Sequence, residues 1–246
     1  MQLRGKTAIV TGGTRSLGRR IAEALLLDGA SVVCAARSEG ELNLLTEVGG
    51  NRVAYHPVDV RDRASVDTLM KFCVDRFGGL DVLVANAGVS RDGPIANIDA
   101  VSWWEVMETN LGGVFHSVQS ALPHLQAHGG GRIFTLSSVL STRVAPGAGA
   151  YSCSKAAVDM FTKVCAAEFA AFGITVNALA PGFVDEGMGQ RLADDELVWD
   201  TYRERMLSGR PGTGAEIGKA AVFLASEQSS YVNGHVLEVS GGLLWA

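Results

Sequence analysis

The chain has 246 residues, 47% of them hydrophobic and only 19% charged, which is enough to bury a sizeable core in one large α/β domain. The formal net charge of −5 argues against a general binder of nucleic acid or of anionic membranes. No apolar stretch reaches the ~18 to 20 residues that span a bilayer, and residues 1–6 lead into an apolar run without a signal-peptide core. We therefore expect a cytoplasmic protein with a small-molecule partner. The cysteines and histidines have no metal-type spacing, so we expect no metal site.

Seven apolar runs of strand length alternate with longer segments of helical period. Such alternation predicts parallel strands joined by crossover helices, and continuous hydrophobicity indicates strands covered on both faces. The sequence therefore predicts a Rossmann-type, doubly wound α/β sheet of about seven strands, with residues 1–246 as a single domain. The strand candidates are residues 7–10, 31–36, 52–58, 81–88, 131–138, 174–181 and 235–240.

The first apolar run is followed by TGGTRSLG, residues 11–18, and then by a helix-like segment. A strand, a glycine-bearing turn and a helix open a dinucleotide-binding unit, because glycines let the backbone approach a pyrophosphate and the helix N-terminus carries partial positive charge. The alternative is a tight strand-to-helix connection that binds nothing.

Tyr151 and Lys155 lie four residues apart in a segment that otherwise has a helical pattern, which places both on one helix face. A tyrosine with a reference pKa of ~10 exchanges protons poorly at neutral pH, but a nearby positive charge favours its phenolate. Taken alone, such a pair is more often an ordinary surface contact.

The separated motifs together are more specific. TGGTRSLG, NAG at residues 86–88, Asn110, Ser138, the Tyr151–Lys155 pair and PG at residues 181–182 resemble, in order and spacing, the short-chain dehydrogenase/reductase family. The resemblance covers essentially the whole chain and is strongest to the bacterial 3-oxoacyl reductases and related ketoreductases.

This resemblance implies a division of labour in the reduction of a ketone. Tyr151 would donate the proton, and Ser138 would donate a hydrogen bond to the substrate oxygen. Lys155 would lower the pKa of Tyr151 and bind the nicotinamide ribose. Asn110 would hold a water that links Lys155 to solvent.

The resemblance also implies a bound dinucleotide. An acidic residue usually follows the second strand in NAD-preferring enzymes, but this chain has Ala36 and then Arg37 there, and Arg15 lies inside the glycine turn. Guanidinium suits a 2′-phosphate, so we expect NADPH and regard NADH as the weaker ligand. The expected cofactor-binding residues are Gly12, Thr14, Arg15, Ser16, Leu17, Gly18, Arg37, Asp59, Val60, Asn86, Ala87, Gly88, Tyr151, Lys155, Pro181, Gly182 and Val184.

Two residues depart from the family pattern. Ser16 replaces the middle glycine of the turn, which places a side chain where the backbone should approach the cofactor. Glu186 replaces a threonine two positions after Val184, which brings a carboxylate near the nicotinamide or the diphosphate. Either the loop turns Glu186 away, or the cofactor contacts differ.

The substrate is less defined by the sequence. We expect residues 183–214 to form a lid, lined by Met188, Trp199, Tyr202 and Met206. Gly129 and Phe172 stand where carrier-protein reductases have basic residues, which favours a free or secondary-metabolite ketone over a carrier-bound one. The alternatives are an NAD(P)-dependent secondary-alcohol or sugar dehydrogenase and a non-catalytic dinucleotide sensor. The resemblance implies a homotetramer.

Overall fold

The fold is taken from a computed structural model that describes residues 1–187, 189–190, 199–200 and 203–244. Seven strands form one parallel sheet in the order β3-β2-β1-β4-β5-β6-β7, so the predicted Rossmann-type α/β fold is confirmed. The strands are β1 (Thr7–Thr11), β2 (Ser31–Ala36), β3 (Val53–Pro57), β4 (Val82–Ala85), β5 (Gly131–Leu136), β6 (Ile174–Pro181) and β7 (Val236–Val239).

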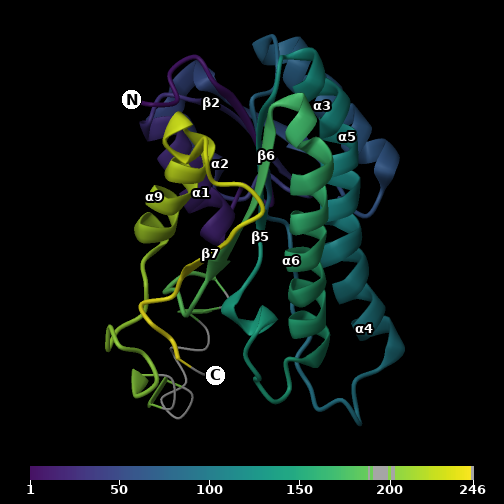
Figure 1. Ribbon diagram of the computed structural model, residues 1–246, viewed down its shortest axis with the longest axis vertical. Coiled ribbons are helices and arrows are strands. Elements are labelled where there is room, and N and C mark those ends of the chain that lie inside the picture. Colours follow the sequence, from purple (N-terminus) through teal and green to yellow (C-terminus); the bar gives the residue numbers. More distant parts are fainter. Residues whose placement is uncertain (188, 191–198, 201–202, 245–246) are drawn as a thin grey trace.

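Helices cover both faces of the sheet (Figure 1). One layer contains α1 (Ser16–Leu27), α2 (Leu42–Gly49) and α9 (Gly214–Ala225), and the other contains α3 (Arg63–Phe77), α5 (Gly113–Ala127) and α6 (Gly149–Phe169). The shorter α4 (Ala100–Met107) leads into α5 through a single π-helical turn, Glu108–Gly112. None of the helices described is long and apolar enough to cross a membrane.

The two cores explain the continuous hydrophobicity of the strands. Ile9 of β1 packs in the cluster formed with α3, α5 and α6, whereas Ala8 and Val10 pack in the cluster formed with α1, α2 and α9. Successive side chains of a strand point to opposite faces, so a strand that is covered on both faces has no polar side.

The strand order reverses between β1 and β4, and the carboxyl ends of the strands at such a point are where doubly wound sheets bind ligands. Thr11, the last residue of β1, ties the two strands together there. Its Oγ1 accepts hydrogen bonds from the backbone N–H groups of Asn86 (3.0 Å) and Ala87 (3.1 Å). The Asn86 side chain donates in return to the Thr11 carbonyl oxygen at 2.8 Å. The segment after β4 is therefore held against the glycine turn.

Replacing Thr11 with valine keeps the side-chain shape but removes the acceptor. The Ala87 N–H then loses its partner, and we expect the free energy of unfolding to fall by about 1–3 kcal/mol. Thr11→Ser keeps the hydroxyl and serves as the control. Urea denaturation of the two variants measures the difference, and equal stability would show that this hydroxyl does not hold the strand ends together.

Candidate active site

Helix α6 presents Tyr151 and Lys155 from one face, toward the carboxyl end of β5. The Lys155 side chain is buried, with only 4% of its surface exposed. Its Nζ donates to the carbonyl oxygen of Leu136, the last residue of β5, at 2.5 Å. The same Nζ lies 5.5 Å from the centre of the Tyr151 ring. This hydrogen bond fixes how α6 sits against the end of the strand.

Ser138 follows β5 by two residues and is brought to the same place. It is buried, its Oγ accepts a hydrogen bond from the backbone N–H of Leu140 at 3.2 Å, and it lies near enough to Tyr151 to lower the pKa of the phenol. The structure therefore groups Ser138, Tyr151 and Lys155, which the sequence separates by 13 and 4 positions.

Burial controls the protonation of both titratable groups. It raises the pKa of Tyr151 above its usual value of 10.0; the hydrogen bond from Ser138 opposes this, and the charge of Asp92 adds to it. Desolvation of the phenolate therefore outweighs the favourable contacts, and the lowering expected from Lys155 stays a prediction. Burial also lowers the pKa of Lys155 to about 8. At neutral pH the phenol is protonated and the lysine carries its charge.

Asp159 is a site residue that the sequence motifs did not indicate. It lies one turn beyond Lys155 on α6, is 7% exposed, and its Oδ1 is buried without a hydrogen-bond partner among the described residues. Its charge raises the pKa of Lys155 against the effect of burial. The i, i+4 spacing from Lys155 was a visible signal, and it continues the spacing of Tyr151 and Lys155.

Asn110 lies in the π-helical turn and is fully buried. Its Oδ1 accepts from the Val89 N–H at 2.8 Å, and its Nδ2 donates to the Val89 carbonyl oxygen at 2.9 Å and to Ser154 Oγ at 3.0 Å. The amide is thus occupied by protein groups, and the water-holding role expected of Asn110 stays a prediction.

The glycine turn has the shape and the donors that a diphosphate needs. A Cβ on Gly18 would stand 2.1 Å from the Gly12 carbonyl oxygen, so the turn closes only around a glycine at position 18. Helix α1 has no side-chain cap at its N-terminus and no acidic residue in its first turn. Its N–H groups remain available to an anion. These residues therefore fit a dinucleotide.

The two predicted arginines lie beside this turn. Thr14 Oγ1 donates to the Ser38 carbonyl oxygen at 3.0 Å, and the Glu41 N–H donates to the Thr14 carbonyl oxygen at 2.8 Å. These bonds bring the loop after β2, with Arg37, next to Arg15. Both arginines are exposed, and neither makes an ion pair or a hydrogen bond within the part of the chain that is described. Two unpaired guanidinium groups at this place suit a 2′-phosphate.

Asp59 and Val60, two of the expected cofactor-binding residues, are partly committed to other contacts. The Asp59 carboxylate pairs with Arg61 at 2.6 Å, and this contact lowers the pKa of Asp59 to about 2, with a smaller effect from Arg37. Val60 is buried against Gly113 of α5. Arg61 is a neighbour that the sequence analysis did not single out.

The loop after β6 begins where the sequence placed it. A Cβ on Gly182 would stand 2.7 Å from Ser240 Cα, and Val184 is buried and bridges to Gly212. Glu186 pairs with Arg20 of α1, so its carboxylate is held against the helix that follows the glycine turn.

Two of the four expected lid residues can be located. Trp199 stacks on Phe183 with ring centres 5.6 Å apart, and Met206 is buried with Phe183, Val139 and Leu243. One member of this small cluster, Val139, directly follows Ser138 in the sequence. Met188 and Tyr202 lie outside the described residues.

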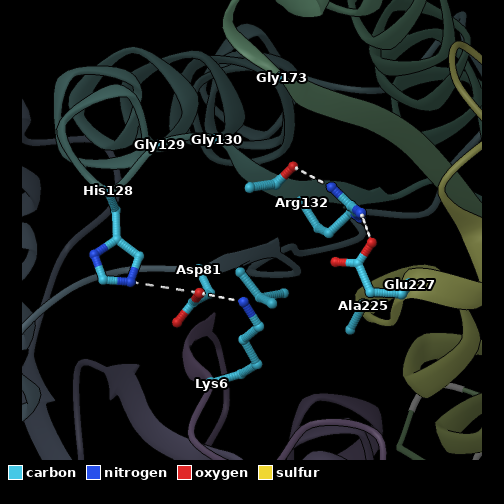
Figure 2. Close-up of a pocket in the computed structure, with 11 residues that line it drawn as sticks. Lys6, Asp81, His128, Gly129, Gly130, Arg132, Gly173, Ala225 and Glu227 are labelled. Carbon is cyan, nitrogen blue, oxygen red and sulfur yellow. Dashed lines mark hydrogen bonds and ion pairs between the residues drawn. The ribbon is translucent and has the colours of Figure 1, made fainter.

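A separate pocket of about 210 Å³ opens at the amino ends of the strands, at the opposite edge of the sheet (Figure 2). Its charged groups pair with one another: Lys6 with Asp81 at 2.9 Å, and Arg132 with Glu227 at 3.0 Å. It contains none of the expected site residues. Among the described residues, no group of three or more His, Cys, Asp or Glu side chains could hold a metal ion.

Removing the charge of Asp159 tests its effect on Lys155. Asp159→Asn leaves the buried ammonium without its nearby carboxylate, so we expect the pKa of Lys155 to fall further below about 8. Asp159→Glu keeps the charge and is the control. An NMR titration of the lysine side-chain resonances measures the pKa, and an unchanged value in Asp159→Asn would contradict the assignment.

Comparison with known proteins agrees with this geometry. A family model described as "Enoyl-(Acyl carrier protein) reductase" matches residues 12–244. The 3-oxoacyl-(acyl-carrier-protein) reductase of Haemophilus influenzae is 37% identical over 241 residues, covering 98% of this chain and 99% of that protein. The protein of the same name from Escherichia coli K12 is 36% identical over 243 residues, with 99% of each covered.

Among solved structures, a gluconate 5-dehydrogenase from Burkholderia cenocepacia J2315, in complex with NADP and tartrate, superposes with a TM-score of 0.93. The two sequences are 35% identical, and the match covers 98% of this chain and 96% of the dehydrogenase chain. Because the family model and these relatives span nearly the whole sequence, the chain belongs to the short-chain dehydrogenase/reductase family and is an NAD(P)-dependent oxidoreductase.

Proposed function

We propose that this protein is an NADPH-dependent ketoreductase in which Tyr151 donates a proton to the carbonyl oxygen of a ketone. The observation that carries the proposal is the grouping of Tyr151 with Ser138 and with the buried ammonium of Lys155, whose Nζ lies 5.5 Å from the centre of the tyrosine ring. Reduction needs a proton donor, and the raised pKa of Tyr151 is consistent with a phenol that can donate at neutral pH.

The residues divide the work as follows. Ser138 orients the substrate oxygen with a hydrogen bond. Tyr151 transfers its proton to that oxygen as the C–O bond becomes an alcohol, and the Lys155 ammonium stabilises the phenolate that remains. A water at the main chain of Asn110 then returns a proton to Tyr151. When bound, NADPH supplies the hydride that adds to the carbonyl carbon.

The cofactor choice rests on charge. Arg15 and Arg37 are unpaired in the described residues and stand where the adenosine end of a dinucleotide would lie. The solved gluconate 5-dehydrogenase holds NADP, which supports the same preference here. NADH lacks the 2′-phosphate and would leave both guanidinium groups without a partner. The remaining expected residues of the glycine turn, of residues 86–88 and of the loop after β6 would hold the rest of the cofactor.

For the substrate, the relatives named as 3-oxoacyl-(acyl-carrier-protein) reductases support a 3-oxoacyl-like or secondary-metabolite ketone. Gly129 lies in a left-handed turn after α5, and Phe172 is 46% exposed; neither offers a cation to an acidic carrier protein. We therefore propose a free ketone. Turnover of free β-keto esters with NADPH tests this, and activity restricted to carrier-bound substrates would overturn it.

A sugar or secondary-alcohol dehydrogenase is the second candidate, favoured by the gluconate 5-dehydrogenase match. Comparing oxidation of gluconate and of secondary alcohols with ketone reduction at pH 7 separates the two. A non-catalytic sensor would bind the dinucleotide without turning over any carbonyl, which the grouping of Ser138, Tyr151 and Lys155 argues against.

The proposal extends to assembly and location. We propose a single domain whose residues 183–214 cover the substrate, acting in the cytoplasm as a homotetramer. Exposed apolar side chains on α5 and α6, namely Phe115, Met160 and Val164, support self-association.

Tyr151→Phe removes the proton donor and leaves the ring in place. We expect the rate of ketone reduction to fall by ~10²- to 10⁴-fold, with NADPH binding and thermal stability close to wild type. Steady-state assays with NADPH oxidation at 340 nm provide the measurement. A variant that retains more than about a tenth of the wild-type rate would contradict the assignment of Tyr151 as the proton donor.

Arg37→Ala removes one of the two unpaired cations. We expect its affinity for NADPH to drop by about 10- to 100-fold, the range of one hydrogen bond to a charged group, while affinity for NADH changes little. Titration of cofactor fluorescence measures both. Arg63, which pairs with Asp67 on the surface of α3, provides a matched control as Arg63→Ala. An equal loss for NADH would mean that Arg37 does not read the 2′-phosphate.

A further inference from the structure

The two residues that depart from the family pattern meet in space. Ser16 has φ = 48°, and no other non-glycine residue in the described part of the chain has a positive φ. Its Cβ and Oγ each lie 2.8 Å from the place where a Cβ on Gly187 would stand. Gly187 itself has φ = 58°. Only a glycine fits there, so the loop after β6 passes directly over the first residue of α1.

Glu186, the neighbour of Gly187, makes a second contact with the same helix. Its Oε1 lies 2.5 Å from Arg20 Nε, and its side chain is only 15% exposed. A Cβ on Gly214, the first residue of α9, would stand 3.0 Å from the same oxygen. The carboxylate is therefore enclosed between α1 and the start of α9. We call the Arg20–Glu186 pair the clasp.

The clasp matters because of where it lies. Arg20 is one turn beyond Ser16, and the N–H groups at the start of α1 are those that fit a diphosphate. An ionised Glu186 beside that site would repel the phosphates if its charge were not compensated. The hydrogen bond to Glu186 is the main cause of the raised pKa of Arg20, which keeps the guanidinium charged at any pH at which the protein is folded.

We propose that Arg20 is a positioning residue for the cofactor: through the clasp it neutralises Glu186 next to the diphosphate site. The inference rests on the proposed function, because it takes the glycine turn as the NADPH site. It assigns to this chain an ion pair in place of the threonine that the family pattern has at position 186.

The test compares the affinity for NADPH of the full-length protein, Arg20→Met, Glu186→Gln and the double variant. Arg20→Met leaves an uncompensated carboxylate, and we expect its affinity to fall by at least about tenfold at low salt. Glu186→Gln should bind NADPH at least as tightly as wild type. The double variant should recover most of the loss, because position 186 is then uncharged and Glu23, which also pairs with Arg20, keeps its contact with Arg19.

Ionic strength separates repulsion from a packing defect. The screening length shrinks from about 10 Å at 0.1 M salt to about 3 Å at 1 M, so the ratio of the Arg20→Met to the wild-type dissociation constant should shrink toward one at high salt. A packing defect would keep this ratio constant. Arg63→Met, which opens the exposed Arg63–Asp67 pair on α3, is the matched control and should leave the affinity at the wild-type value.

Thermal melting of each cofactor-free variant shows whether it is folded. If Arg20→Met does not fold, two other variants replace it: Arg20→Lys keeps the charge, and Arg20→Gln removes it. The same tenfold difference in affinity for NADPH is expected between these two. A folded Arg20→Met or Arg20→Gln single variant that binds NADPH as wild type does, or a loss that adding Glu186→Gln does not rescue, would overturn the clasp. Failure of the wild-type protein to bind NADPH would instead refute the proposed function.

Discussion

The hydrogen bond from the buried ammonium of Lys155 to the carbonyl oxygen of Leu136 is the interaction on which the site depends. It joins the face of α6 that carries Tyr151 and Lys155 to the last residue of β5, and Ser138 lies two residues further along the chain. Taking this ammonium out of water is costly, and the lowered pKa of Lys155 reflects that cost. The carbonyl and the charge of Asp159 offset part of it. The same burial raises the pKa of Tyr151. One desolvated environment therefore affects both the position of α6 against β5 and the protonation of Tyr151 and Lys155.

The strands were predictable from the sequence because a strand that is covered on both faces of the sheet has a continuous run of apolar residues. Seven such runs in the sequence correspond to the seven strands, with Ile9 and Val10 facing opposite cores. The grouping of Ser138, Tyr151 and Lys155 was also predictable, since β5 delivers Ser138 to the edge that α6 covers. Each of these inferences uses local contacts, or the fact that the carboxyl ends of parallel strands lie at the same edge of the sheet.

Other features were not predictable because they depend on distant contacts or on a balance of opposing effects. Glu186 and Arg20 are 166 positions apart, and nothing in either local sequence indicates the other. The direction of the pKa of Tyr151 depends on whether desolvation exceeds the attraction of nearby groups, which the spacing of Tyr151 and Lys155 alone does not decide. The π-helical turn that carries Asn110 likewise has no periodicity signal.

The segment after β7 pairs with the region that follows α6 and β6. Met206 and Leu243 form an antiparallel bridge, and the Ser208 N–H donates to the Gly241 carbonyl oxygen at 2.9 Å. Residues 241–244 therefore help to shape the side of the molecule where Ser138 lies, whereas Met1 is 84% exposed and lies toward the far end (Figure 1). For anyone attaching an affinity tag, a fluorophore or a solid support, the amino terminus is the end to use, because a load on the other end would pull on residues 241–244 and on the segment after β6 that pairs with them.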